Sequence, residues 1–242
     1  MKIKHAFLLF GIIITASYVF LIPNRFNRVH DEDKTIATHS KSSGKETIDL
    51  DTLEQLAEAE TSNILVDYYE SEILLGALKA PDSLVSQMAL LDVQYLGYDS
   101  LIHQGQIIVN NSVANEVRLI FDELLIARFP IEKVIPAIYY KWNDDSSMFY
   151  NNSSSFNYRR VKNSSKLSSH SLGLAIDINP RENPHIDRFG NISPSNGVYN
   201  SSHRGTITES SQCFKIFKKY GWKWGGNWRY SKDYQHFSKS GQ

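Results

Sequence analysis

The pattern of apolar and polar positions predicts short strands in the second half of the chain, beginning near residue 83. Leu91, Val93 and Tyr95 alternate with polar neighbours, as the side chains of a half-buried strand do. After a turn, the largely apolar run 105–109 follows. Two such runs joined by a short connection predict a β-hairpin.

Helical spacing replaces this alternation after the hairpin. Ser112 is expected to open a helix, because the apolar positions from there to Leu124 recur every three to four residues. A second helix is expected to end at Tyr220, just before a glycine, with Thr208 or Ser210 as its N-terminal cap.

Between these two helices the chain is expected to form strands and loops. Residues 137–142 follow a proline and are predicted to be a short strand, and the Asn- and Ser-rich residues 143–155 are predicted to be a polar loop. Residues 183–206 are predicted to be another long loop, of the length found at binding sites. Short strands with two intervening helices predict an α+β fold, a small antiparallel sheet flanked by helices.

A histidine and an aspartate lie seven residues apart in the stretch 166–180. Between His170 and Asp177, apolar residues alternate with small ones, which predicts a strand with Asp177 on the face opposite an apolar row. A carboxylate in that place needs a partner, because an isolated charge is costly to remove from water. We expect the partner to be a metal ion, with His170 entering from the preceding turn and a third ligand supplied by residues 232–237.

Composition limits the kind of metal site and the kind of partner. The chain has 242 residues, with 26 lysines and arginines against 26 aspartates and glutamates, so a nucleic-acid partner is not expected. Cys213 is the only cysteine, which excludes an intrachain disulfide and a thiolate metal site. Two histidines with one or two carboxylates suit catalytic zinc, which keeps a coordination position open. Three tryptophans are expected mainly in the core, with one able to line a cleft: Trp222, Trp224 and Trp228.

The N-terminus is expected to hold the protein at a membrane. Lys2 and Lys4 precede an uncharged run that Pro23 closes, and bulky residues before Pro23 offer no small-residue cleavage site. Residues 1–23 are therefore predicted to be a retained signal or anchor helix, which places the rest of the chain outside the cytoplasm. Cleavage would instead leave a secreted or periplasmic protein.

Three further segments follow the anchor. The polar residues 24–50 are predicted to be a flexible linker. Residues 51–82 have a helical pattern without clear caps, and residues 83–242 are predicted to form a single domain.

The motif around His170 and the pair near the C-terminus together resemble a known family, the zinc D-alanyl-D-alanine carboxypeptidases with their L-alanyl-D-glutamate endopeptidase relatives. The resemblance covers about residues 88–238, in the family's order and without a missing block. The residues that carry it are Ser168, His170, Gly173, Ala175, Asp177, Asp233 and His236, with 156–159, 177–180, 183–184 and 221–228 around them.

The resemblance implies a single bound zinc ion and assigns roles to the residues that match. The implied zinc ligands are His170, Asp177 and His236. Asp233 matches the acid/base carboxylate, although much of the family has glutamate there, which reaches one methylene further. Arg159 matches the arginine that faces the scissile carbonyl, and its neighbour Arg160 is the alternative.

The expected function is that of a monomeric, membrane-anchored zinc peptidase acting on the stem peptides of bacterial peptidoglycan. The resemblance supplies the substrate class and leaves open whether a terminal D-alanine is removed or an internal L-alanyl-D-glutamate bond is cut. One alternative is a non-catalytic, zinc-stabilised module that binds wall peptides or a partner. Another is a different zinc hydrolase, such as an amidase. A binding module has no use for Asp233, which favours the peptidase.

Overall fold

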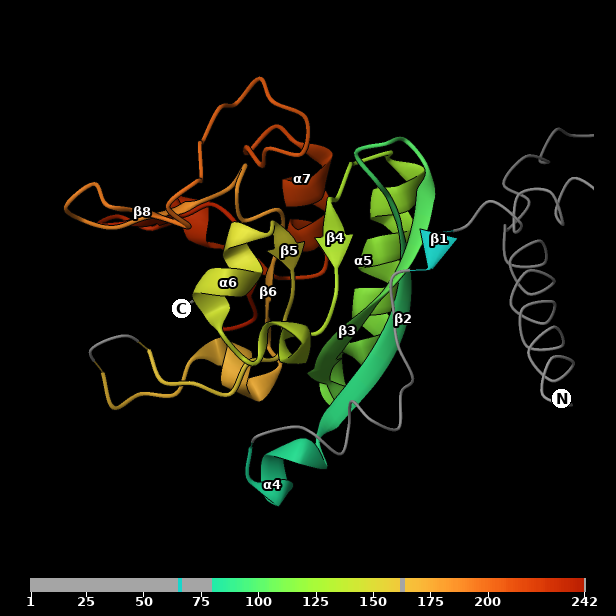
Figure 1. Ribbon diagram of the computed structural model, residues 1–242. Helices are drawn as coiled ribbons and strands as arrows, with labels where there is room; N and C mark the ends of the chain where they lie inside the picture. The colour runs from blue at the N-terminus through green and yellow to red at the C-terminus, as the bar shows by residue number, and fades with distance from the viewer. Residues whose placement is uncertain (1–64, 67–79, 162–163, 242) are drawn as a thin grey trace, which may run out of the picture. The chain divides into compact units, whose positions relative to one another are not determined.

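The computed structural model describes three stretches of the chain, residues 65–66, 80–161 and 164–241 (Figure 1). All of them fall within one compact unit, residues 63–242. The predicted anchor, residues 1–23, and the predicted linker, residues 24–50, lie outside the described residues, as does most of the segment 51–82. Within the described stretches, no helix is long and apolar enough to cross a membrane.

The predicted hairpin is confirmed. β2 (Met88–Leu96) and β3 (Ile102–Asn110) pair antiparallel from end to end, with Met88 opposite Asn110 and Leu96 opposite Ile102. Leu91, Val93 and Tyr95 are all buried in the core, as their alternation predicts.

The predicted first helix is also confirmed. It begins with the 3-10 turn η1 (Asn111–Val113) and continues as α5 (Ala114–Ile126), which packs against β2. Asn110 caps the turn, because its Oδ1 accepts a hydrogen bond from Ser112 N at 3.0 Å. The buried positions of α5 follow the helical spacing of the sequence: Val117, Ile120, Phe121 and Leu124.

A short strand extends the hairpin sheet on the β3 side. β1 (Leu65–Val66) pairs parallel with β3 opposite His103 and Gln104, so the strand order is β1-β3-β2. The helical prediction for residues 51–82 is therefore wrong at these two positions. The physical reason is that an open strand edge offers unpaired backbone groups, which even a two-residue extended segment can pair. The one-turn helix α4 (Asp82–Val85) then leads into β2.

The segment after α5 departs most from the sequence prediction. Residues 137–142 are not a strand: η2 (Ala137–Tyr140) is a 3-10 turn, and Lys141 and Trp142 follow it with φ of 53° and 63°. The predicted loop 143–155 contains the helix α6 (Asp144–Phe149). Asn143 caps this helix by accepting from Ser146 N at 2.8 Å, so the polar residues that suggested a loop are helix-initiating residues instead. β4 (Lys133–Val134) and β5 (Asn152–Ser153) pair parallel on either side of this segment.

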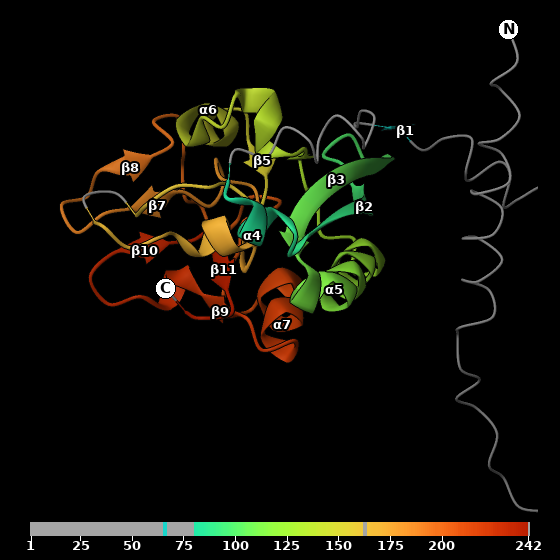
Figure 2. The ribbon, with the colours of Figure 1, turned by 90° about the horizontal axis from the view of Figure 1, so that it is seen from below.

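Two small antiparallel sheets carry Asp177, His236 and Asp233, and strands β7 to β11 of these sheets are labelled in Figure 2. The first has the order β6 (Ala175–Asp177), β11 (His236–Ser238), β9 (Lys223–Trp224). The second has the order β10 (Lys232–Asp233), β7 (His185–Ile186), β8 (Ile192–Ser193), and its β7–β8 hairpin lies in the predicted loop 183–206. These sheets and helices confirm the α+β class, although the described residues form four small sheets where the sequence suggested one.

The second predicted helix, α7 (Gln212–Lys219), joins the site sheets to the hairpin layer. Ser211 is its cap and accepts from Phe214 N, so the predicted caps one and three residues earlier are wrong. α7 packs against α5, and the Phe217 ring stacks on the Phe237 ring of β11 with centroids 4.0 Å apart. The core therefore runs without interruption from α5 to the strands that carry the site.

Candidate metal centre

His170 is placed by a 3-10 turn rather than by a long strand. The turn η3 (Ser169–Leu172) is capped by Ser168, and the predicted strand is confirmed only at β6. Gly173 ends the turn with φ of 63°, a conformation that side chains other than glycine rarely adopt. A Cβ at Gly173 would lie 2.5 Å from Asn110 N, so the glycine also lets the turn approach the β2–β3 hairpin.

Asp177 and His236 are placed by strand register. β6 and β11 pair antiparallel with His236 directly opposite Asp177, so the two side chains share one face of the sheet. The next pair, Ile176 and Phe237, points to the other face and is buried in the core. A shift of one residue in this pairing would send the ligands into the core, so the apolar pair fixes the position of the polar pair.

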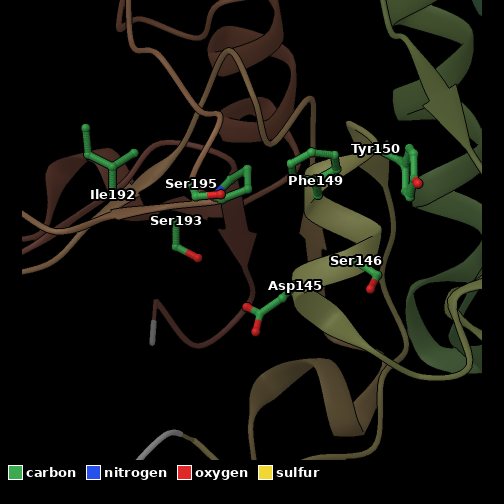
Figure 3. Close-up of a pocket in the computed structure, with 8 residues that line it drawn as sticks. Asp145, Ser146, Phe149, Tyr150, Ile192, Ser193 and Ser195 are labelled. Carbon is green, nitrogen blue, oxygen red and sulfur yellow. The ribbon is translucent and has the colours of Figure 1, made fainter.

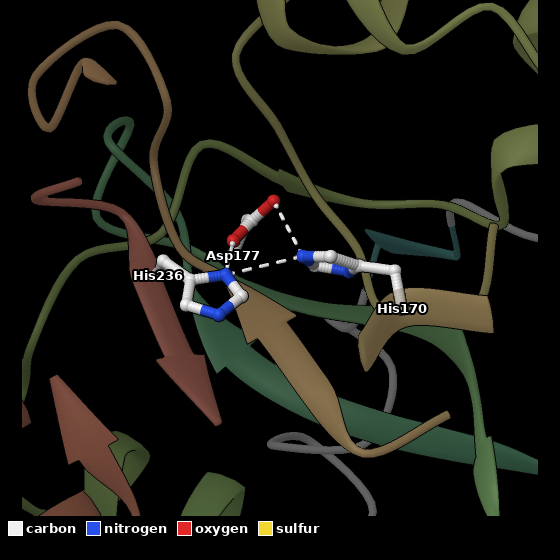
Figure 4. Close-up of side chains that lie close together, drawn as sticks. All are labelled: His170, Asp177 and His236. Carbon is white, nitrogen blue, oxygen red and sulfur yellow. Dashed lines mark hydrogen bonds and ion pairs between the residues drawn. The ribbon is translucent and has the colours of Figure 1, made fainter. Parts of the chain in front are cut away.

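The three predicted ligands converge (Figure 4). His170 Nε2 lies 3.2 Å from Asp177 Oδ2, and His236 Nδ1 lies 3.0 Å from Asp177 Oδ1. The two ring nitrogens are 3.2 Å apart. All three residues are buried and offer one donor atom each within 4.8 Å of the others.

The donor set suits a divalent metal ion. Tetrahedral zinc bonds of about 2.0–2.1 Å put ligand atoms roughly 3.3 Å apart, close to the separations just given. His170 Nδ1 lies 2.7 Å from the carbonyl oxygen of Ser155, which is an acceptor only, so Nδ1 carries the proton and Nε2 offers its lone pair. Burial alone would raise the pKa of Asp177, but its contacts with His170 and His236 hold that pKa well below the usual carboxyl range.

Asp233 lies beside this cluster and is half-buried. It is in β10, opposite His185 of β7, and its Oδ1 is buried without a hydrogen-bond partner among the described residues. A Cβ at Gly225 would lie 2.9 Å from Asp233 Cβ and 3.3 Å from His236 Cβ, so both side chains start next to this glycine. Burial, followed by the nearby Asp177 carboxylate, raises the pKa of Asp233 against the opposing effect of His236.

The two candidate arginines have different surroundings. Arg159 Nη2 forms an ion pair of 2.8 Å with Asp144 of α6, and its backbone N–H donates to Ser171 Oγ in the turn that carries His170. Arg159 Nε is buried and has no hydrogen-bond partner in the described part of the chain. Arg160 Nη1 donates to the carbonyl of Ser165 instead. Arg159 is therefore the one tied to both α6 and η3.

Some supporting residues gave no signal in the sequence. Ser155 acts through its backbone carbonyl, which any residue type could supply. Lys232 Nζ donates to the carbonyls of Gly226 and Trp228 at 3.0 and 2.8 Å, which ties the turn η4 (Gly225–Asn227) to β10. The Trp228 ring lies 5.5 Å from the His236 ring, so this is the tryptophan that borders the site, whereas Trp222 and Trp224 are in the core as expected.

An α+β fold with a buried His–Asp–His cluster, and beside it a carboxylate whose Oδ1 has no hydrogen-bond partner among the described residues, has the parts of a mononuclear metallohydrolase site. A family model described as D-alanyl-D-alanine carboxypeptidase matches residues 162–239, which confirms the resemblance predicted from the motifs. The matched segment contains His170, Asp177, Asp233 and His236, and Arg159 lies just before it. No curated protein and no solved structure shows significant similarity to the chain.

Proposed function

We propose that this protein is a zinc-dependent peptidase that hydrolyses peptide bonds in the stem peptides of bacterial peptidoglycan. The observation that carries the proposal is the buried His170–Asp177–His236 cluster with the unpartnered Asp233 Oδ1 beside it. A cluster that only stabilised the fold would need no buried carboxylate without a partner, because leaving a buried acceptor unpaired costs free energy. The family match over residues 162–239 supports the same reaction class.

The residues divide into holding and reacting groups. His170 Nε2, His236 Nδ1 and Asp177 would hold a single zinc ion, which supplies Lewis acidity and lowers the pKa of a water molecule to about 7. Asp233, whose Oδ1 is buried without a partner among the described residues, would accept a proton from the attacking water and return it to the leaving amine. Its raised pKa favours both steps, since a carboxyl with an ordinary pKa is a weaker base.

Arg159 is proposed to stabilise negative charge on the carbonyl oxygen of the scissile bond. Its ion pair with Asp144 uses Nη2 and leaves the buried Nε for another acceptor. A donor in such a place contributes about 3 kcal/mol to transition-state stabilisation. The contact of Arg160 with the Ser165 carbonyl makes Arg160 the weaker candidate.

The bond that is cut is tested by the masses of the products. Purified peptidoglycan, and separately its soluble muropeptides, are incubated with the full chain, and Asp233→Asn serves as the matched control. The proposal predicts either loss of a terminal D-alanine or release of stems cut at an internal L-alanyl-D-glutamate bond. Cleavage between sugar and peptide would identify an amidase, and tight binding without any new mass would identify a non-catalytic module.

We also propose that the domain works outside the cytoplasm as a monomer, anchored by residues 1–23. The support is the charge and hydropathy pattern of that segment together with a substrate found at the cell wall. Fractionation tests the location: the full chain should sediment with membranes, and external protease should release an active soluble fragment. A mature species that lacks residues 1–23 and is free of the membrane would show that the signal is cleaved instead.

A further inference from the structure

A pocket of about 520 Å³ lies between α6 and the β8 strand (Figure 3). The α6 wall includes Phe149 and Tyr150, and the β8 wall includes Ile192. These three side chains are 46%, 57% and 46% exposed, which is unusual for large apolar groups gathered in one place. Asn196 Nδ2 donates to the carbonyl of Phe149 at 3.0 Å and joins the two walls. The two walls of the pocket are therefore held together by a direct hydrogen bond.

Both walls of the pocket are tied to the candidate metal centre. β8 belongs to the same three-stranded sheet as β10, which carries Asp233. α6 carries Asp144, the ion-pair partner of Arg159. Met148 of α6 accepts a hydrogen bond of 3.5 Å at its sulfur from Gln235 Nε2, and Gln235 directly precedes His236. The pocket therefore lies on the same elements that carry Asp233 and the ion-pair partner of Arg159.

The charge of the pocket comes from one residue. Of the described residues that line it, only Asp145 is charged. Its neighbour Asp144 is neutralised by Arg159, whereas no lysine, arginine or histidine in the described ranges forms an ion pair with Asp145. The hydroxyl of Ser193 lines the pocket on the β8 side, across from the Asp145 carboxylate (Figure 3). A ligand group that binds here should be positively charged and should donate a hydrogen bond to the Ser193 hydroxyl oxygen. A primary ammonium meets both requirements.

We propose that this pocket is a subsite for a substrate side chain that carries a primary ammonium group on an aliphatic arm, as the diamino acid of a peptidoglycan stem does. The proposal rests on the proposed function and deepens it. The aliphatic arm packs against Ile192 and the rings of Phe149 and Tyr150, which also attract a cation through their faces. The ammonium pairs with Asp145 and donates to Ser193. Asp145 is then a residue that determines specificity, separate from the metal ligands.

A pair of synthetic stem peptides tests the subsite directly. The two peptides differ only at the diamino-acid position, where one has lysine and the other has norleucine, an isostere without the ammonium. The full chain should show a kcat/KM for the lysine peptide about fivefold higher, the ratio that corresponds to about 1 kcal/mol for a partly exposed ion pair. The difference should appear in KM, because the subsite lies away from the reacting atoms.

Substitution of Asp145 should remove this preference. Asp145→Asn should bring the ratio close to one and leave the norleucine peptide unaffected, and Asp145→Lys should reverse the preference toward a peptide with glutamate at that position. Asp82→Asn is the matched control: Asp82 is also exposed and in the first turn of a short helix, but α4 is not part of the pocket. This control should keep the wild-type ratio. A ratio near one in the wild type, or a ratio that Asp145→Asn leaves unchanged, would overturn the subsite.

Failure of the proposed function can be told apart from failure of the subsite. If neither peptide is cleaved, the peptidase assignment fails, and calorimetric binding of the same two peptides then tests the pocket alone. Preferential binding of the lysine peptide that is lost in Asp145→Asn supports the subsite even without turnover. Equal binding of both peptides contradicts it.

Discussion

Two halves of the domain are stabilised in different ways. The hairpin half, made of β2, β3 and α5, has nine-residue strands and a thirteen-residue helix whose apolar faces meet in the core. The site half, made of residues 147–183 and 222–238, has strands of two or three residues. Strands this short pair few of the backbone groups around them, so another source of hydrogen bonds is required.

Buried asparagine side chains supply those hydrogen bonds in the site half. Asn183 Nδ2 donates to the carbonyls of Ile178, Asn179 and Gly205, and its Oδ1 accepts from Ile207 N at 2.6 Å. Asn179 bridges Glu132 N, Pro130 O and Gly205 O in the same manner. Both asparagines are fully buried. They hold the irregular chain directly after Asp177, so the polar network fixes the position of a ligand.

The comparison shows that stability and site geometry come from different kinds of interaction. Apolar burial is non-directional and tolerates small changes of position, whereas hydrogen bonds fix distances and angles. A site whose donor atoms must meet at about 3 Å needs the second kind. We therefore expect substitutions in the hairpin half to change mainly the free energy of unfolding, and substitutions in the site half to change metal binding and activity as well.

The largest expected effect is on activity and comes from Asp233. Asp233→Ala should retain the metal and the fold but lower kcat about 10²–10⁴-fold, because it removes the group that moves the proton. Asp233→Glu should recover part of the activity, since a carboxylate is restored with a longer reach. Peptide hydrolysis and elemental analysis on the same samples provide the measurement. Loss of metal together with activity would show that Asp233 holds the ion.

The next largest effect is on stability in the hairpin half. Leu124 is fully buried in α5, and Leu124→Ala should lower the free energy of unfolding by about 2–5 kcal/mol through lost burial and a residual cavity. Leu119 lies on the same helix but is 50% exposed, so Leu119→Ala is the matched control and should cost much less. Denaturant unfolding measures both. Metal content per folded chain should stay at the wild-type value in each variant.

A smaller but more revealing effect is expected from Asn183. Asn183→Ala should cost about 1–3 kcal/mol, because the N–H of the buried Ile207 loses its acceptor. It should also weaken metal binding, because the chain after Asp177 loses the hydrogen bonds that hold it in place. Asn227→Ala, at an exposed position, should change stability by less than about 0.5 kcal/mol. Chelator competition and urea unfolding are the two readouts. Unchanged metal affinity in Asn183→Ala would break the proposed link between the asparagine network and the site.

The smallest effect is expected where the two halves meet at the surface. Glu116 of α5 accepts from Trp222 Nε1 at 2.9 Å and pairs with Lys239 Nζ at 2.9 Å. Glu116→Gln keeps an acceptor for the indole but removes the charge, so it should cost about 0.5 kcal/mol. Glu116→Ala removes both and should cost more. Equal costs in thermal unfolding would show that the ion pair, and not the indole hydrogen bond, joins the two halves.

The same contrast explains what could be predicted from the sequence. Periodicity predicted the hairpin and the helix α5, because long elements bury one face repeatedly and leave a repeating pattern. The shorter helix α7 was predicted instead from polar residues before it and the glycine after it. It failed at residues 137–155, where Asn143 starts a helix through its side chain and Lys141 and Trp142 take left-handed conformations. Single polar residues determine the backbone conformation there, and a single residue leaves no repeating pattern in the sequence.

The candidate metal ligands were predicted from a motif, and not from periodicity. His170, Asp177 and His236 were assigned from a motif and its resemblance, and the structure brings their side chains together. Ser155 could not be predicted, because its carbonyl contributes and its side chain does not. Pairing of Leu65 and Val66 with β3 could not be predicted either, because two residues are too few to show alternation.

The most direct test of the account is the zinc content of four purified variants, measured by elemental analysis on folded protein. The wild type should bind a single zinc ion, and His170→Ala, Asp177→Ala and His236→Ala should each bind far less, because each removes one of three buried donors. His203→Ala, at an exposed position in the loop before α7, is the control and should keep the full content. Full zinc retention in any of the three ligand variants, with the fold intact, would contradict the assignment of that residue and with it the proposed metal centre.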